Sequence, residues 1–453
     1  MNNGNPNNNN KSNSYRVVPF YEIEQDLAMF VTDEEIYEAY LDCREHKQGT
    51  IAAMQFESNL EENLCDLADE LNSRTYRISA SIAFCVTRPK LREVFAASFR
   101  DRVVHHLVAI RLNPIIEAEM IDETYNCRKE KGVLKAIEEL REHIRLISEN
   151  YTRECYVLTC DIKGFFMHID KELLWRRLEE LIDAKYEGKD KDGLKWIVRM
   201  IVMNRPEENC IKVGNVELFD QLDPDKSKFK NGGMKGVEIG NLPSQIFANF
   251  FLTPFDHFIK AEVMWYERYA DDFALVDTDK KKLLRLIPVM RRKLMEEFGL
   301  ELHPNKIYLQ SYTKGVKFVG CVVKYGRIMA GNRMVGNLVS LVQRMKDCED
   351  KEGECERYAA RLNSYFNFIR HGAEHATLSR INREIQADWS KYLYMDRNYV
   401  IKVKKKYKTK HKIIETVKKN RYGDESNSKK RRVRRARYKR KRRNRDVQHT
   451  GNV

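Results

Sequence analysis

Two adjacent carboxylates separate two short apolar runs in residues 266–276, which read YERYADDFALV. Aromatic and β-branched residues favour strands and aspartate favours turns, so this stretch predicts a β-hairpin with Asp271 and Asp272 at its tip. Two like charges at the end of a half-buried hairpin are costly unless a cation offsets them. Taken alone, the pattern also fits a solvated Asp-Asp turn.

A third carboxylate, Asp161, ends an upstream apolar strand in the segment YVLTCDIKGFF, residues 156–166. Three carboxylates at the ends of neighbouring strands supply the oxygen ligands that a two-Mg²⁺ phosphoryl-transfer site requires. In such a site the ions lie about 3.5–4 Å apart and stabilise the attacking 3′-oxygen and the leaving pyrophosphate. The sequence therefore predicts Asp161, Asp271 and Asp272 as catalytic ligands of two Mg²⁺ ions.

The order of these motifs resembles the palm of a reverse transcriptase: a strand ending in Asp161, an aromatic residue five positions later at Phe166, and YADD in a hairpin. The resemblance covers roughly residues 15–400. It implies an α+β right-hand polymerase fold, with fingers, an antiparallel palm sheet and a helical thumb. It also implies an RNA-directed DNA polymerase whose partners are template RNA, the cDNA–RNA duplex and deoxynucleotides.

The resemblance places further residues around the nucleotide. The order PK-x-R followed by FRDRVVHH is similar to the fingers of bacterial reverse transcriptases, so Lys90 and Arg92 are expected to contact the triphosphate. A solvated hairpin is the alternative for this pair. Ile162 would present its backbone to the triphosphate and to a metal ion, and Lys306 would lie near the leaving pyrophosphate as a general acid. A surface lysine is the alternative for Lys306.

Phe166 is expected under the incoming sugar, where a bulky ring leaves no room for a 2′-hydroxyl and so favours deoxynucleotides. Plain core packing is the alternative, given the neighbouring Phe165. One departure from the family pattern lies in the fingers segment TYNCRKEKG, residues 124–132, where Glu130 replaces a usual glycine.

The segment Ile239-Gly240-x-x-x-Ser244-Gln245 indicates a particular group of reverse transcriptases, because most group II intron-like enzymes carry QGxxxSP at this place instead. The form seen here resembles the enzymes of diversity-generating retroelements, which copy a template RNA with errors concentrated at adenines. We expect Ile239, Gly240 and Gln245 to lie beside the nascent base pair. An aliphatic Ile239 gives up a polar contact, so we hypothesise that it relaxes fidelity. The resemblance also implies a small basic accessory protein that assembles as a ring.

The formal charge of +15 is concentrated at one end. Residues 401–453 hold 23 Lys/Arg and 4 Asp/Glu, a net of +19, whereas the other 400 residues have a net of −4. Such a tail is expected to bind the phosphate groups of RNA or a protein partner. The predicted divisions are a disordered Asn-rich leader at 1–14, fingers at 15–155, a palm at 156–330 with an inserted connection at 184–232, a helical thumb at 331–400 and the basic tail at 401–453.

Several function classes are disfavoured by composition. No apolar run approaches membrane-spanning length and no signal peptide is recognisable, so we expect a cytoplasmic protein, bacterial or phage-encoded. The ten cysteines show neither disulfide nor zinc spacing, and His105-His106 is expected to pack or cap a helix. Two alternatives stay open at this point: a phage-defence reverse transcriptase and a non-catalytic RNA-binding scaffold.

Overall fold

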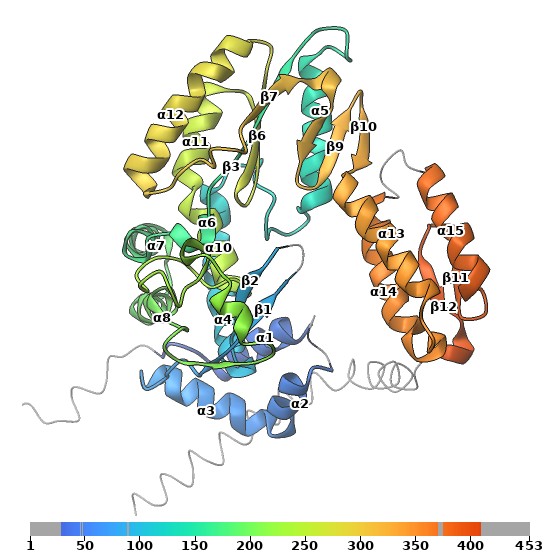
Figure 1. Cartoon of the computed structure of the whole chain (residues 1–453). Helices are drawn as coiled ribbons and strands as arrows, with labels where there is room; N and C mark the ends of the chain where they lie inside the picture. Colours follow the sequence, from blue (N-terminus) through green and yellow to red (C-terminus); the bar gives the residue numbers. More distant parts are fainter. Residues whose placement is uncertain (1–28, 46, 48, 88–89, 370–374, 409–453) are drawn as a thin grey trace, which may run out of the picture.

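The computed structural model describes residues 29–45, 47, 49–87, 90–369 and 375–408. The predicted leader at 1–14 and the tail beyond residue 408 lie outside the described residues. The described chain forms an N-terminal body of helices and a small sheet, a central sheet covered by helices, and a C-terminal helical body (Figure 1). These match the expected fingers, palm and thumb, and we use those names for them.

A four-stranded antiparallel sheet, with strand order β5-β6-β3-β7, forms the centre of the palm. Its strands are β3 (Tyr156–Asp161), β5 (Trp265–Tyr269), β6 (Asp272–Asp277) and β7 (Tyr308–Ser311). Strands β5 and β6 form the predicted hairpin around the YADD turn. The prediction of an antiparallel palm sheet is confirmed.

Both faces of this sheet are covered, because alternate residues of β3 and β6 enter two different cores. Leu158 and Leu275 lie in a core with the helices α10 (Leu242–Phe251), α11 (Thr253–Glu262) and α12 (Lys280–Phe298). Val157 and Val276 lie in the opposite core, with α5 (Val133–Ile147) and the strands β8 (Val316–Phe318), β9 (Cys321–Lys324) and β10 (Arg327–Ala330). Burial on both faces explains why these strands read as almost continuous apolar runs.

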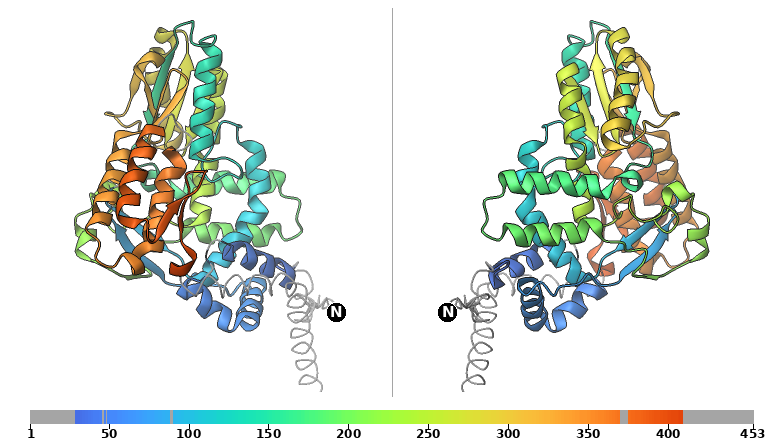
Figure 2. Two further views of the ribbon diagram at one scale, coloured as in Figure 1. Left: turned by 90° about the vertical axis from the view of Figure 1, so that its right-hand side faces the viewer. Right: turned by 90° about the vertical axis from the view of Figure 1, so that its left-hand side faces the viewer.

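The fingers contain a second sheet, with order β2-β1-β4. Strands β1 (Ser81–Val86) and β2 (Arg92–Ala96) form the predicted hairpin, and β4 (Cys210–Lys212) of the inserted connection pairs parallel to β1. Figure 2 shows α7 and α8 of the fingers running side by side. The fingers helices are α1 (Asp33–Arg44), α2 (Ile51–Ser58), α3 (Leu60–Asn72), α4 (Phe99–Glu119), α7 (Lys171–Lys185) and α8 (Lys191–Met203).

The thumb has a hydrophobic core of its own, separate from the two palm cores. Its elements are α13 (Asn332–Lys346), α14 (Lys351–Ile369), α15 (His375–Trp389), β11 (Leu393–Met395) and β12 (Ile401–Val403). Five short helical elements complete the described chain: the helices α6 (Phe165–His168) and α9 (Glu217–Asp220) and the 3₁₀ turns η2 (Pro224–Lys226), η3 (Tyr312–Lys314) and η4 (Lys405–Tyr407).

The predicted domain limits stay predictions, because packing continues across some of them. One core extends from Phe30 in the fingers to Leu302 in the palm, and α5 packs on the palm sheet although its sequence precedes residue 156. Within the described residues, no helix combines the length and apolar character needed to cross a membrane.

Candidate active site

The structure brings Asp161, Asp271 and Asp272 to one end of the palm sheet. Asp161 is the last residue of β3 and lies directly opposite Asp272, the first residue of β6. Asp271 lies in the turn before β6, and its carbonyl oxygen accepts a 3.0 Å hydrogen bond from the backbone N–H of Ile162. Asp161 and the Asp271–Asp272 pair, about 110 residues apart in the chain, therefore lie at the same end of the sheet.

Because the Ile162 N–H is used in this way, it does not serve a triphosphate in this arrangement. The Ile162 side chain is fully buried in the palm core. The expectation of a metal or nucleotide contact at this residue therefore depends on its carbonyl alone.

Burial and mutual repulsion shape the electrostatics of the carboxylates. The pKa of Asp271 is raised by burial and then by the charge of Asp161. Burial, followed by the charges of Asp271 and Asp161, raises the pKa of Asp272 to about 7. Both shifts show that concentrated negative charge is costly here, which is the condition under which a divalent cation is favoured.

Lys306 supplies a positive charge at this edge, since its ammonium group forms an ion pair with the Asp161 carboxylate. Among the described residues, no three His, Cys, Asp or Glu side chains already form a closed ligand set for a metal ion. The donor set nevertheless fits Mg²⁺, which prefers a few carboxylate oxygens and keeps several waters. Binding through Asp161 would require Lys306 to turn away from that carboxylate.

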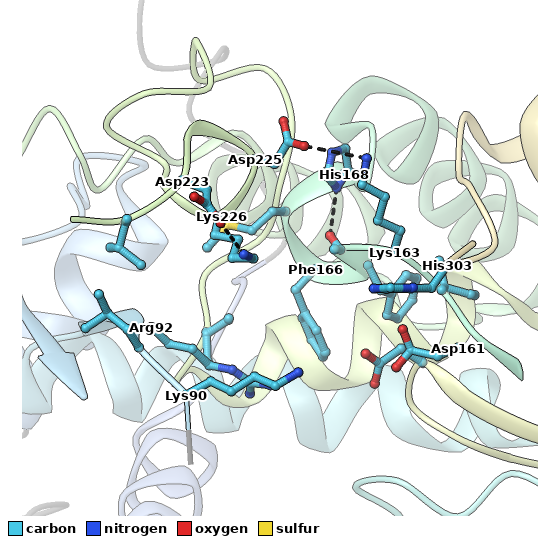
Figure 3. A pocket seen from close by; sticks show the side chains of 18 of the residues that line it. Lys90, Arg92, Asp161, Lys163, Phe166, His168, Asp223, Asp225, Lys226 and His303 are labelled. Atoms are coloured by element: carbon cyan, nitrogen blue, oxygen red, sulfur yellow. Dashed lines mark hydrogen bonds and ion pairs between the residues drawn. The ribbon is translucent and has the colours of Figure 1, made fainter. Parts of the chain in front are cut away.

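A cavity of about 840 Å³ opens beside the carboxylates (Figure 3). Lys90 and Arg92 extend into it from the fingers hairpin, across from Asp161 and the Phe166 ring. Asp271, Ile162, Ile239 and Lys306 also line it. The structure therefore gathers basic residues, a flat ring and carboxylates around one space large enough for a nucleotide.

Phe166 is held by its backbone as well as by packing. Its carbonyl oxygen accepts a 2.8 Å hydrogen bond from Val237 N–H, and its ring packs edge-on against Phe165. Gly236, with φ +85°, lets its segment approach the backbone of α6, since a Cβ there would lie 3.0 Å from the Met167 carbonyl oxygen. The absence of a Cβ at Gly236 thus serves packing within the protein.

Of the three residues predicted beside the base pair, Ile239 lines the cavity, whereas Gly240 and Gln245 contact other parts of the protein. Ile239 lines the cavity, and its carbonyl oxygen accepts a hydrogen bond from Phe95 N–H of β2. Gly240 (φ +118°) lies against β2, where a Cβ would lie 2.8 Å from a Val94 methyl carbon. Gln245 is not among the residues that line the cavity, and its side-chain oxygen accepts a hydrogen bond from Asn126.

One wall of the cavity, residues 221–226 of the inserted connection, has no role assigned from the sequence. This wall is fixed to the fingers hairpin by Glu93, a fully buried carboxylate of β2. Glu93 accepts hydrogen bonds from the Ser227 hydroxyl at 2.9 Å and from the Lys228 backbone N–H. A charged residue at an inward-facing position of β2 was the available signal, but its partner lies 134 residues away.

Residues 87–323 match the family model described as reverse transcriptase (RNA-dependent DNA polymerase), which is more than half of the chain. The chain belongs to the reverse transcriptase family. The match contains strand β2 of the fingers hairpin, the palm sheet and all three carboxylates, and the residues that line the cavity all lie within it.

Among curated proteins, the chain is similar to Protein YkfC of Escherichia coli (strain K12), at 23% identity over 291 residues, covering 56% of this chain and 69% of that protein. Among solved structures it is similar to telomerase from Candida albicans in complex with a TWJ fragment of telomeric RNA, with 12% identity and a TM-score of 0.40. That match covers 70% of this chain and 62% of the telomerase. Apo telomerase from Candida tropicalis gives 11% identity and a TM-score of 0.41, covering 69% of this chain and 58% of that chain. The reverse transcriptase thus spans less than two thirds of these telomerase chains.

The raised pKa of Asp272 gives this reverse transcriptase a pH-dependent stability. The ordinary pKa of the group is 3.8 and the folded value is about 7, so between these values the folded state holds a proton that the unfolded state has lost. Stability of the metal-free protein therefore falls as pH rises through this window. We expect Asp272→Asn to raise the melting temperature by a few degrees at about pH 8 and hardly at all at about pH 4.

Thermal unfolding in EDTA at these two pH values measures the effect. Adding Mg²⁺ at about pH 8 should raise the melting temperature of the wild type more than that of the variant. Equal melting temperatures of wild type and variant across the pH range would contradict the electrostatic account.

Proposed function

We propose that this reverse transcriptase synthesises cDNA on an RNA template by a two-metal mechanism. The observation that carries the proposal is that Asp161 and Asp271 line a cavity together with Lys90, Arg92 and Phe166, and that Asp272 lies directly opposite Asp161 in the palm sheet. When bound, two Mg²⁺ ions would supply activation of the primer 3′-oxygen and charge stabilisation at the leaving pyrophosphate.

The residues of the chain have distinct parts in this proposal. Asp161 and Asp271 hold the ions, with Asp272 as the third carboxylate and the Ile162 carbonyl as a further ligand. Lys90 and Arg92 lie on the fingers side of the cavity, where ammonium and guanidinium groups bind phosphate oxygens.

Phe166 excludes the 2′-hydroxyl of a ribonucleotide. Lys306, released from Asp161, donates a proton near the pyrophosphate.

The purified protein with Mg²⁺, a primed RNA template and deoxynucleotides tests the activity directly. Full-length cDNA that disappears when Mg²⁺ is chelated supports the proposal. RNA binding without any synthesis, on primed and unprimed templates alike, would instead support a non-catalytic scaffold. Sequencing the RNA and cDNA that co-purify with the protein would identify the template.

We further propose that the enzyme is of the diversity-generating retroelement type, acting in mutagenic retrohoming with a small basic accessory protein ring. The support is the Ile239-Gly240-x-x-x-Ser244-Gln245 pattern, together with the position of Ile239 on the cavity wall. A template repeat beside a variable repeat in the neighbouring DNA would favour this type over a defence enzyme.

Replacing Ile239 with the glutamine that most group II intron-like enzymes carry tests whether this side chain causes the proposed errors at adenines. Ile239→Gln is expected to lower misincorporation opposite template adenine by about tenfold, because a glutamine can hydrogen-bond near the nascent pair and penalise a wrong geometry. Sequencing of cDNA made on a defined RNA measures the error spectrum. Ile239→Leu is the matched control and should keep the wild-type spectrum. An unchanged adenine error rate in Ile239→Gln would show that this side chain does not set fidelity.

A further inference from the structure

The turn that carries the carboxylate pair is strained. Ala270 has φ +55°, a left-handed conformation that a residue with a Cβ adopts only when its surroundings enforce it. Asp271 and Asp272 follow directly, so their direction depends on how firmly this residue is held. The enforcing contacts can be traced outward from the turn.

The first contact comes from Arg268, a fully buried residue of β5. Its guanidinium group donates a 3.2 Å hydrogen bond to the Ala270 carbonyl oxygen. The same group is fixed by Asp256 of α11, through hydrogen bonds of 2.7 and 2.6 Å. Asp256 is itself fully buried and also accepts from the Tyr266 hydroxyl at 2.7 Å. A buried arginine with a two-point carboxylate partner is a rigid support.

The second contact leads from Arg268 to α10. The guanidinium group donates to the Asn249 carbonyl oxygen at 3.1 Å and to its side-chain oxygen at 3.4 Å. The side-chain nitrogen of Asn249 donates to the backbone carbonyl oxygen of Asn126. Asn249 and Asn126 are both buried, so these bonds have little competition from water.

The last contact reaches Gln245. Its side-chain oxygen accepts a 2.9 Å hydrogen bond from the side-chain nitrogen of Asn126. A continuous chain therefore runs from Gln245 through Asn126, Asn249 and Arg268 to the Ala270 carbonyl oxygen. Gln245 lies one turn before Asn249 on α10, so a single helix presents both amides to the same fingers segment.

We propose that Gln245 is a positioning residue for the carboxylate turn, acting through Asn126, Asn249 and Arg268 rather than by touching the nucleotide. The inference rests on the proposed polymerase function, since it assigns a role in that reaction. It also explains why Gln245 does not line the cavity although it belongs to the same motif as Ile239. Losing the acceptor at Gln245 frees the Asn126 side chain and loosens the hold on the turn.

Gln245→Met tests the chain, because methionine keeps the length of the side chain and removes the amide. We expect kcat for cDNA synthesis to fall about tenfold, within the range for residues that orient ligands from behind. The Mg²⁺ concentration for half-maximal rate should rise, while KM for deoxynucleotide changes by less than about twofold. Amide hydrogen exchange in a peptide covering residues 266–276 should become faster without added metal or substrate.

Two further variants make the test specific. Gln386→Met is the matched control, because Gln386 is also a half-buried glutamine that bonds an asparagine side chain, in the thumb. It should leave exchange at residues 266–276 unchanged. Gln245→Glu keeps an oxygen acceptor for Asn126 and should restore slow exchange and most of kcat.

Two results would overturn the inference. The first is a raised KM for deoxynucleotide with unchanged kcat in Gln245→Met, which would mean that Gln245 touches the nucleotide. The second is wild-type exchange at residues 266–276 in that variant. If the wild-type protein makes no cDNA, the proposed function fails, yet the exchange comparison still decides whether Gln245 holds the turn.

Discussion

Replacing Asp271 with asparagine is expected to reduce cDNA synthesis by at least about 10³-fold, because a carboxylate that holds a catalytic cation supplies several kcal/mol of transition-state stabilisation. The asparagine keeps the shape of the side chain and removes its charge. The Asp271 backbone would keep its hydrogen bond from Ile162 N–H, so the turn itself should survive. Primer extension on RNA, measured under single-turnover conditions, gives the rate constants of wild type and variant.

Asp277→Asn is the matched control for this variant. Asp277 ends the same strand, β6, at the edge of the sheet away from the carboxylates, and it pairs with Lys282. The control makes the same chemical change on the same strand and should retain synthesis within about threefold, as surface ion pairs contribute little. Affinity for the RNA template should be unchanged in both variants. Substantial synthesis by Asp271→Asn would remove the carboxylate cluster from the mechanism.

The parts of the site that sequence could predict are those fixed by local pattern. Apolar runs on both sides of Asp271 and Asp272 predict the hairpin, and the run before Asp161 predicts the neighbouring strand; both are present. Asp161 ends its strand, whereas Asp272 begins its own. The two carboxylates can therefore reach one cation only if these strands pair antiparallel. Lys306 was placed by resemblance, and its ion pair with Asp161 puts it at that edge.

The parts that sequence could not predict depend on buried polar partners that are far apart in the chain. Glu93 looks like one more surface charge until Ser227 and Lys228 are seen to bond it. Arg268 likewise looks in the sequence like a solvent-exposed residue of a strand. In the structure it is buried, because Asp256 forms an ion pair with it. The spacing of apolar residues reveals which face of a helix or strand is buried, but it does not reveal contacts between polar side chains. The hydrogen bond of Gln245 could not be predicted for the same reason, since its partner Asn126 belongs to a different segment.

The inserted connection illustrates a second limit. Its strand β4 has three residues, too short for a pattern to be read, and it joins the fingers sheet beside β1. The segment that follows then returns to the cavity as the wall at residues 221–226. A sequence reading assigned the whole connection to the palm because it lies between palm motifs. Topology, rather than composition, decides that it also builds the fingers side of the cavity.

Phe166→Val is expected to lower the preference for deoxynucleotides over ribonucleotides by about 10²-fold, measured as the ratio of kcat/KM values. The ring is the flat surface of the cavity between the fingers residues Lys90 and Arg92 and the Asp161 carboxylate (Figure 3). Exclusion of a 2′-hydroxyl by a ring is steric, so a smaller side chain should admit ribonucleotides while deoxynucleotide KM changes little. Primer extension with each nucleotide class on one RNA template gives the ratio.

Phe165→Val separates this effect from loss of packing. Phe165 is almost fully buried and contacts the Phe166 ring edge-on, so the two variants make the same change at adjacent rings. Removing the buried ring should cost more stability, because it leaves a cavity in the core, but it should keep the preference for deoxynucleotides. If instead both variants lose stability and neither changes the preference, Phe166 is a packing residue. Sugar selection would then have to come from another part of the cavity wall, which includes residues 221–226.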